Sequence, residues 1–87
     1  MSKFDVQDVR KIVVTSSDKY EDFNNLCTGV YLISDTDCYI NFNYPATTGS
    51  FLVKANQFYH MEKLGFNTLH VIGTSGNLYI CATRATR

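Results

Sequence analysis

Alternation of apolar and polar residues is the feature that most constrains how this chain can fold. In the segment CYINFNY, residues 38–44, successive side chains of an extended chain point to opposite faces. One face would carry Cys38, Ile40, Phe42 and Tyr44. The other would carry Tyr39, Asn41 and Asn43. A period of two residues indicates a β-strand with one buried face.

Other segments are also short, rich in β-branched or aromatic residues, and bounded by turn residues. Ala55-Asn56 and Ser75-Gly76 are expected to form tight turns, because Asn and Gly tolerate the left-handed backbone conformation. The spacing predicts about seven strands, at residues 11–17, 29–34, 38–44, 50–54, 57–63, 68–74 and 77–84. Short strands at this spacing are typical of an all-β fold, a single-domain antiparallel β-sandwich or small barrel.

Residues 17–27, SDKYEDFNNLC, do not follow the alternation. Asp18 and Glu21 resemble a capping box, and the apolar residues that follow have helical spacing. Asn24-Asn25 would end such a helix early. One or two helical turns and an irregular arm are both open at this point. We therefore expect residues 1–28 to form an N-terminal strand and arm, and residues 29–87 to form the sandwich core of one domain.

Composition and charge exclude several classes of protein. The chain has 87 residues and a net charge of zero, so it lacks the basic face that nucleic-acid binding requires. No apolar stretch is long enough to span a membrane, and the N-terminus has no signal-peptide pattern. We expect a soluble protein made in a cytoplasm. A charge near zero also leaves little repulsion between copies.

The three cysteines do not have the spacing of a metal site. Cys27, Cys38 and Cys81 are far apart, and no Cys-x-x-Cys or paired histidine completes a zinc site. We expect reduced thiols that pack as small apolar side chains, with one disulfide and one free thiol as the alternative.

Asp35 and Asp37 raise the question of a cation site. A calcium loop would need an Asp or Asn, a Gly and a Glu where this chain has Tyr39, Ile40 and Ala46. The stronger interpretation is the polar tip of a hairpin, in which the carboxylates accept bonds from nearby backbone N–H groups. A bound cation remains the weaker alternative.

No catalytic or cofactor pattern is present. His60 and His70 lie in different expected strands, and neither belongs to a helical metalloprotease motif. No base and orienting group can be assigned to Cys38 or Cys81 as nucleophiles. We expect no enzymatic activity, no cofactor, no metal and no small-molecule substrate.

Aromatic residues are abundant, with six Tyr and six Phe. We expect Phe42, Phe51 and Phe58 to fill the core. Tyrosine and asparagine on exposed strand faces are candidates for a protein interface, because a rigid amphipathic ring gives large contact area at low entropic cost. The candidate interface residues are Tyr31, Tyr39, Asn41, Asn43, Tyr59 and Tyr79.

Residues 29–84 resemble small virion proteins of tailed bacteriophages in layout. The shared elements are a strand, a short polar turn, a strand ending in an aromatic residue and a Thr/Ser/Ala-rich loop. The segment LVKANQFY and a closing hairpin with its turn at Ser75-Gly76 complete the pattern. The segment before Gly29 departs from it. The resemblance implies a non-enzymatic β-sandwich component that decorates capsids or lies at head–tail junctions or on tails.

These expectations combine into one function and one alternative. The first is a structural bacteriophage protein, located in the virion, that binds other virion proteins (major capsid, portal or tail) and copies of itself. Exposed strand edges and tyrosine-rich faces would make the contacts. The alternative is a carbohydrate- or ligand-binding module, such as a tail or fibre accessory domain. Its binding rim would contain Asp37, Tyr39, Asn41 and Asn43.

Overall fold

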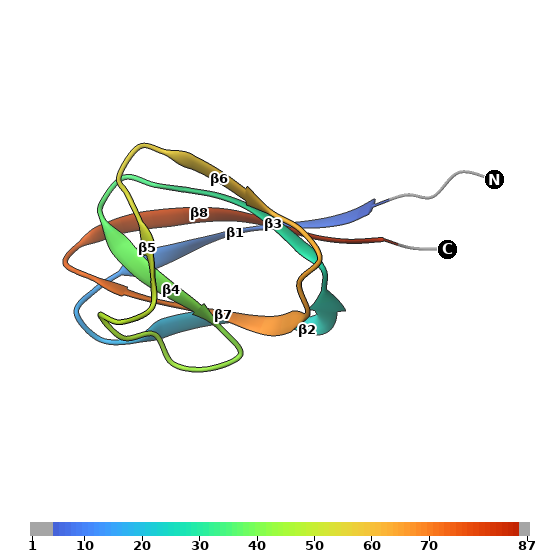
Figure 1. Ribbon diagram of the computed structural model, residues 1–87, viewed down its shortest axis with the longest axis horizontal. Helices are drawn as coiled ribbons and strands as arrows, with labels where there is room; N and C mark the ends of the chain where they lie inside the picture. Colours follow the sequence, from blue (N-terminus) through green and yellow to red (C-terminus); the bar gives the residue numbers. More distant parts are fainter. Residues whose placement is uncertain (1–4, 86–87) are drawn as a thin grey trace.

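The computed structural model describes residues 5–85, and every regular element in that range is a β-strand (Figure 1). The all-β class is therefore confirmed, but with eight strands instead of about seven. The strands are β1 (Asp5–Val14), β2 (Lys19–Cys27), β3 (Gly29–Ser34), β4 (Cys38–Phe42), β5 (Phe51–Val53), β6 (Phe58–Met61), β7 (Phe66–Gly73) and β8 (Gly76–Ala85).

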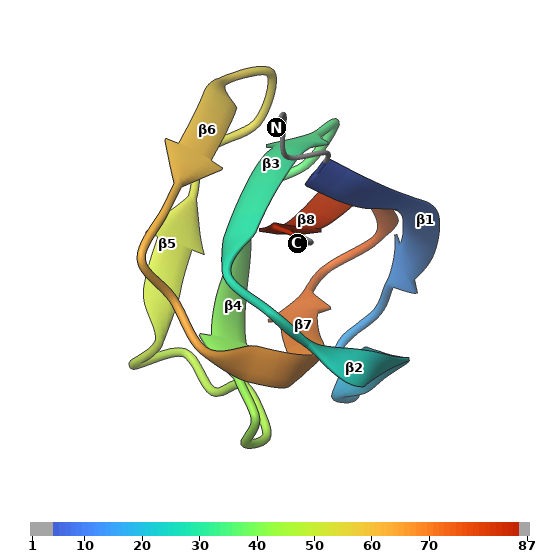
Figure 2. The ribbon, with the colours of Figure 1, turned by 90° about the vertical axis from the view of Figure 1, so that its right-hand side faces the viewer.

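The strands form two four-stranded antiparallel sheets. Sheet A has the order β1-β8-β3-β6, and sheet B has the order β2-β7-β4-β5. The sheets face each other, with β6 opposite β5 at one side and β1 opposite β2 at the other (Figure 2). Buried side chains from both sheets belong to one hydrophobic cluster. The inner face of each sheet therefore contributes to a common core.

The expected helix or arm at residues 17–27 is wrong, because this segment is β2. Residues Lys19–Asp22 pair with β7, and Cys27 pairs again with Phe66 after a shift in register. Asn24 at the shift has a left-handed φ of 63°. The irregular strand still buries Phe23 and Cys27 against the core. A bulged strand places its apolar residues at uneven intervals, which explains the resemblance to helical spacing.

Most connections cross from one sheet to the other. Of the consecutive strands, only β4 and β5 pair with each other. The turn 35–37 joins β3 of sheet A to β4 of sheet B, so the expected hairpin there is wrong. The turns at Ala55-Asn56 and Ser75-Gly76 also link the two sheets, so the hairpin expected around Ser75-Gly76 is wrong as well. Asn56 has the expected left-handed backbone, with φ of 63°. Turn chemistry thus predicted the turns, but not which strands they bring together.

The buried aromatic residues differ from those expected. Phe66 and Phe23 are buried and pack edge to face, with ring centroids 5.9 Å apart. Phe42 is partly buried beside Phe66, at 4.8 Å. Phe51 and Phe58 are exposed, which corrects their assignment to the core. Phe58 is exposed because its neighbour Tyr59 takes the inward position on β6.

Candidate functional site

The six residues proposed for an interface lie in four different places. Tyr31 on β3 and Tyr79 on β8 lie on the outer face of sheet A, since the residues beside them in each strand are buried. Tyr39 and Asn41 alternate with buried Cys38 and Ile40, and so lie on the outer face of sheet B. The remaining two have structural contacts, so the six do not form one surface.

Asn43 and Tyr59 form hydrogen bonds that connect separate parts of the fold. Asn43 has a φ of 69°, accepts a hydrogen bond from the Asn67 N–H at 2.8 Å, and donates to the Gly65 carbonyl at 3.1 Å. It therefore joins the end of β4 to the start of β7. Tyr59 packs against the core, and its hydroxyl accepts from the Lys54 N–H at 3.0 Å.

The centre of the outer face of sheet A is apolar, although outer faces of antiparallel sheets are commonly polar. Backbone pairing arranges its side chains in two rows across the four strands. One row contains Val9, Cys81, Tyr31 and His60. The other contains Lys11, Tyr79, Ile33 and Phe58. We call the group Val9, Tyr31, Ile33, Phe58, Tyr79 and Cys81 the apolar outer face.

Aromatic stacking orders part of this face. Tyr31 stacks on His60 with ring centroids 4.1 Å apart and an angle of 4° between the planes. Phe58 lies 5.8 Å from the Tyr31 ring. The His60 imidazole is also 3.2 Å from the Glu62 carboxylate. Tyr31 is thus held in place by its neighbours, which reduces the side-chain entropy that a contact at this ring would cost.

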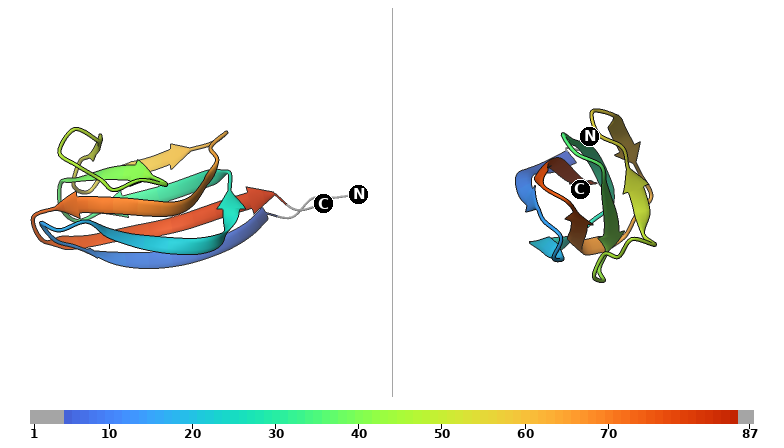
Figure 3. Two further views of the ribbon diagram at one scale, coloured as in Figure 1. Left: turned by 90° about the horizontal axis from the view of Figure 1, so that it is seen from below. Right: turned by 90° about the vertical axis from the view of Figure 1, so that its left-hand side faces the viewer.

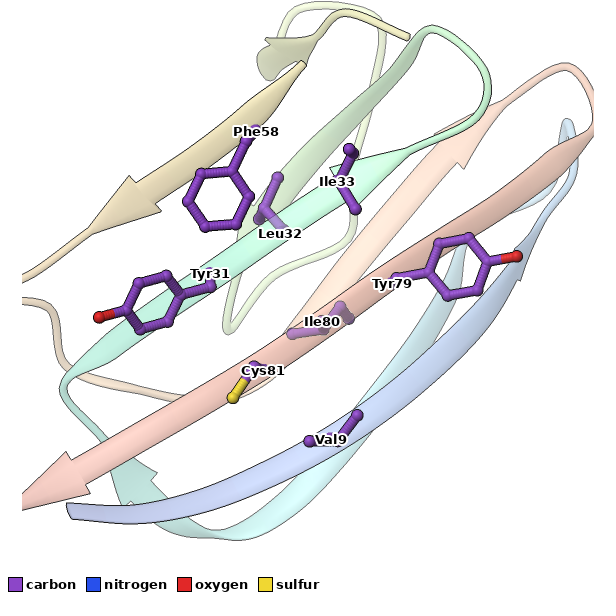
Figure 4. Close-up of a pocket in the computed structure, with 8 residues that line it drawn as sticks. All are labelled: Val9, Tyr31, Leu32, Ile33, Phe58, Tyr79, Ile80 and Cys81. Carbon is purple, nitrogen blue, oxygen red and sulfur yellow. The ribbon is translucent and has the colours of Figure 1, made fainter. Parts of the chain in front are cut away.

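A shallow depression of about 190 Å³ lies within the apolar outer face (Figure 4). Val9, Tyr31, Phe58 and Tyr79 are among its lining residues, and the lining is almost wholly apolar. Cys81 lies between Val9 and Tyr31 in its row and is much smaller than the aromatic residues around it. The depression therefore follows from a small side chain among large ones.

Two strands carry a sequence signal for this face that period-two alternation does not reveal. Residues 30–33 (VYLI) and 78–81 (LYIC) are apolar without interruption. Such runs are typical of strands that are covered on both faces. No such apolar run surrounds Val9, which lies between Asp8 and Arg10. The first expected strand also begins at residue 11, so the sequence pattern does not place Val9 on this face.

The outer face of sheet B carries a polar cluster beside an apolar row of Leu52, Tyr39 and Ile72. The His70 imidazole Nδ1 lies 2.9 Å from the Asp18 carboxylate, and its Nε2 lies 3.2 Å from the Thr68 hydroxyl. Tyr20 stacks on the imidazole at 5.0 Å. Asp18 also accepts a hydrogen bond from the Ala46 N–H at 2.9 Å. The Asp18 carboxylate therefore links the β1–β2 turn to β7 and to the β4–β5 loop.

The order of carboxylate, imidazole and hydroxyl resembles that of a nucleophilic triad. A triad also needs free N–H donors near the nucleophile to stabilise an oxyanion. The N–H groups of Thr68 and the preceding Asn67 both point to the Asn43 side-chain oxygen, at 3.4 and 2.8 Å. Those donors are occupied, and the geometry fits a structural cluster better than a catalytic one.

Asp35 and Asp37 do accept backbone hydrogen bonds, but from residues distant in sequence. Asp35 accepts from the Asn77 N–H at 2.7 Å, and Asp37 accepts from the Ala55 N–H at 2.8 Å. These bonds lower the pKa of each carboxyl below its ordinary value, with Lys54 adding to the effect at Asp37. Across residues 5–85, no three His, Cys, Asp or Glu side chains are grouped to hold a metal ion.

All three cysteines are free thiols. Cys27 and Cys38 are buried, and burial raises the pKa of both thiols, which suppresses the reactive thiolate. Cys81 is partly exposed on the apolar outer face. The reduced state itself stays a prediction.

No family model, curated protein or solved structure matches this chain. Within the described part of the chain, there is also no helix with the length and apolar character to cross a bilayer. The functional argument therefore depends on the surfaces described above.

Proposed function

We propose that this protein is a non-enzymatic structural component of a bacteriophage particle, either a capsid-decoration protein or a head–tail connector subunit. It would act by associating with copies of itself and with capsid, portal or tail proteins in the virion. The observation that carries the proposal is the apolar outer face of sheet A. Apolar side chains there, including Val9 and Phe58, remain exposed in the isolated chain.

Burial of this face would favour association. Removing apolar surface from water contributes about 25 cal/mol per Å², and contiguous apolar patches on soluble proteins mark interaction sites. Aromatic residues at the centre of an interface contribute most of the binding energy. Tyr31, Phe58 and Tyr79 supply three such rings around one depression.

The strand order supports the same proposal by analogy. The orders β1-β8-β3-β6 and β2-β7-β4-β5, with most connections crossing between sheets, correspond to an eight-stranded jelly-roll sandwich. This arrangement occurs in viral capsid domains, but also in lectins and cupins. Fold analogy does not assign a function by itself, so the exposed face remains the main argument.

The test uses matched surface variants on the two sides of the molecule. Phe58 is 65% exposed on sheet A, and Tyr44 is 69% exposed after β4 of sheet B. Phe58→Ser should weaken binding to gradient-purified particles about tenfold or more, as measured by co-sedimentation and mass spectrometry. Tyr44→Ser should bind as the unchanged protein does. Absence of the unchanged protein from purified particles would refute the proposal.

A carbohydrate-binding module is the second candidate, favoured by the exposed aromatic rings of the apolar outer face, on which sugars could stack. The rim expected for this function is less suitable. Asp37 and Asn43 use their side-chain oxygens within the fold, and Asn41 donates to the Pro45 carbonyl at 3.3 Å. A glycan array without hits, with and without calcium, would remove this candidate.

A further inference from the structure

The two sheets have four edge strands, and only one of them is long and regular. β5 and β6 are short, covering Phe51–Val53 and Phe58–Met61. β2 is interrupted by the register shift between Asp22 and Cys27. Short or bulged edges are common protection against unwanted strand pairing. β1 has neither protection, because it pairs with β8 without a shift from Asp5 to Val14.

The free side of β1 is available for pairing. Figure 3 shows β1 at the margin of the molecule, where it extends with β8 beyond the other strands. In the part of the chain that the structure describes, the backbone of residues 8–13 forms no hydrogen bond outside its ladder with β8. Val9 and Val13 on this strand are 75% and 58% exposed. A long, regular edge strand with exposed valines can act as a template for an added strand.

We infer that β1 pairs antiparallel with β1 of a second copy of this chain, about a two-fold axis that places Val9 opposite Val9. The inference rests on the proposed function, because it specifies how the self-association proposed there begins. Such a contact is isologous, since both copies use the same surface. It would join the two A sheets into one continuous eight-stranded sheet.

Charge complementarity selects both the partner and the register. With Val9 on the axis, Asp8 of each copy lies opposite Arg10 of the other, and Gln7 lies opposite Lys11. Opposite charges across strands stabilise a pair, and like charges destabilise it. Shifting the axis to residue 10 or 11 would place Arg10 or Lys11 opposite itself. Of these registers, the one centred on Val9 is the register in which opposite charges face each other.

The existing contacts of Arg10 agree with this pairing. Its guanidinium binds Asp8 at 2.6 Å and Glu21 at 2.6 Å, and the three side chains are partly exposed. The contacts also hold Arg10 in place over the Phe23 ring, at 5.0 Å. Two copies would thus form an alternating cluster of carboxylates and guanidinium groups. The outer faces of both copies would lie on the same side of the joined sheet.

Disulfide trapping tests the register directly. Val9→Cys should cross-link two copies under mild oxidation, because directly opposed Cα atoms are about 4.5–5.5 Å apart and disulfides span about 4.4–6.8 Å. Cys81 pairs with Val9 within the chain, so the background variant is Cys81→Ser. Lys11→Cys is the matched control and should not cross-link to itself, because its two copies would be about 14 Å apart along the strands.

A mixed pair sharpens the same test. Gln7→Cys and Lys11→Cys chains, each in the Cys81→Ser background, should cross-link to each other. Strong self-cross-linking of Lys11→Cys, or none at Val9→Cys in a protein that is dimeric by sedimentation, would overturn the register. Circular dichroism shows whether the Val9→Cys variant folds. If it does not fold, cross-linking between the Gln7→Cys and Lys11→Cys chains tests the register.

Charge reversal provides a second measurement that needs no cysteine. Asp8→Arg alone and Arg10→Asp alone should each reduce self-association, because each places like charges opposite one another. An equimolar mixture of the two variants should recover it as a heterodimer. Failure of the mixture to associate, when both variants are folded, would contradict the inference.

The outcomes separate this inference from the proposed function. A chain that is found in particles but is never cross-linked at Val9 would refute β1 pairing and leave the structural role intact. A chain that cross-links at Val9 but is absent from particles would support the pairing and refute the virion role. A strictly monomeric chain at high concentration would refute the pairing.

Discussion

The outer faces of the two sheets contrast strongly, although both sheets share one core. The outer face of sheet A presents Val9, Ile33 and Phe58 to solvent, together with tyrosine rings. The outer face of sheet B includes the His70 cluster, in which Asp18 and Thr68 satisfy the imidazole. The polar groups of the His70 cluster are hydrogen-bonded within the chain. Sheet B also has an outer apolar row of Leu52, Tyr39 and Ile72, but Leu52 is less exposed than Val9 and Phe58 on sheet A. This difference is the reason that we propose sheet A, and not sheet B, as the side that contacts a partner.

The two sheets share one hydrophobic core, so a substitution in that core should destabilise both of them. Phe66→Ala tests this, and should lower the free energy of unfolding by about 3–5 kcal/mol because it leaves a cavity between the sheets. Chemical denaturation followed by circular dichroism measures the loss. Hydrogen exchange should increase in β3 and β4 together. An increase confined to sheet B would show that the sheets do not share the core, and Phe51→Ala on an exposed ring is the control.

The polar cluster of sheet B should contribute to stability and not to association. Asp18→Ala removes the acceptor for His70 and for the Ala46 N–H, and should cost about 1–3 kcal/mol of unfolding free energy. Asp18→Asn keeps one acceptor and should cost less. Thermal unfolding ranks the variants. If Asp18→Ala instead abolished particle binding and left the stability unchanged, the partner would bind at sheet B and not at sheet A.

Thiol labelling compares the two environments without disturbing the fold. Cys81 should react with a maleimide in the native protein, while buried Cys27 and Cys38 should react only after unfolding. Binding of the apolar outer face to a partner should slow the labelling of Cys81. Mass spectrometry locates the modified residue. Equal rates in free and particle-bound protein would mean that this face stays exposed.

The turn aspartates should give the smallest effect. The folded-state pKa of Asp37 is lowered from 3.8, so its contribution to stability is complete above that pH and is lost as the pH falls further. In Asp37→Asn, the decrease of the unfolding free energy below about pH 4 should be shallower. Denaturation at a series of pH values measures it. An unchanged slope would show that the bond to the Ala55 N–H does not persist in solution.

Part of the candidate site could be predicted from the residues. Alternation with apolar neighbours predicts outward positions for Tyr31 and Tyr79, and both lie on the apolar outer face. The same alternation predicts an outward Asn43, but its left-handed backbone ends the strand and directs its side chain to Gly65 and Asn67. The size and apolar character of Phe58 predict a core position, because a large apolar residue is usually buried. Its place on an edge strand, opposite Ile33, depended on pairing across the sheet.

The local sequence determined the all-β class, most of the strands and the turns between them, because alternation and turn chemistry act over a few neighbouring residues. The tertiary structure decided which strands pair, since consecutive strands here mostly join opposite sheets. It also made a strand of residues 19–27, where burial of Phe23 and Cys27 outweighed the apparent helical spacing. The apolar outer face exists only once residues 9, 31, 58 and 79, distant in sequence, are placed side by side by non-local hydrogen bonding.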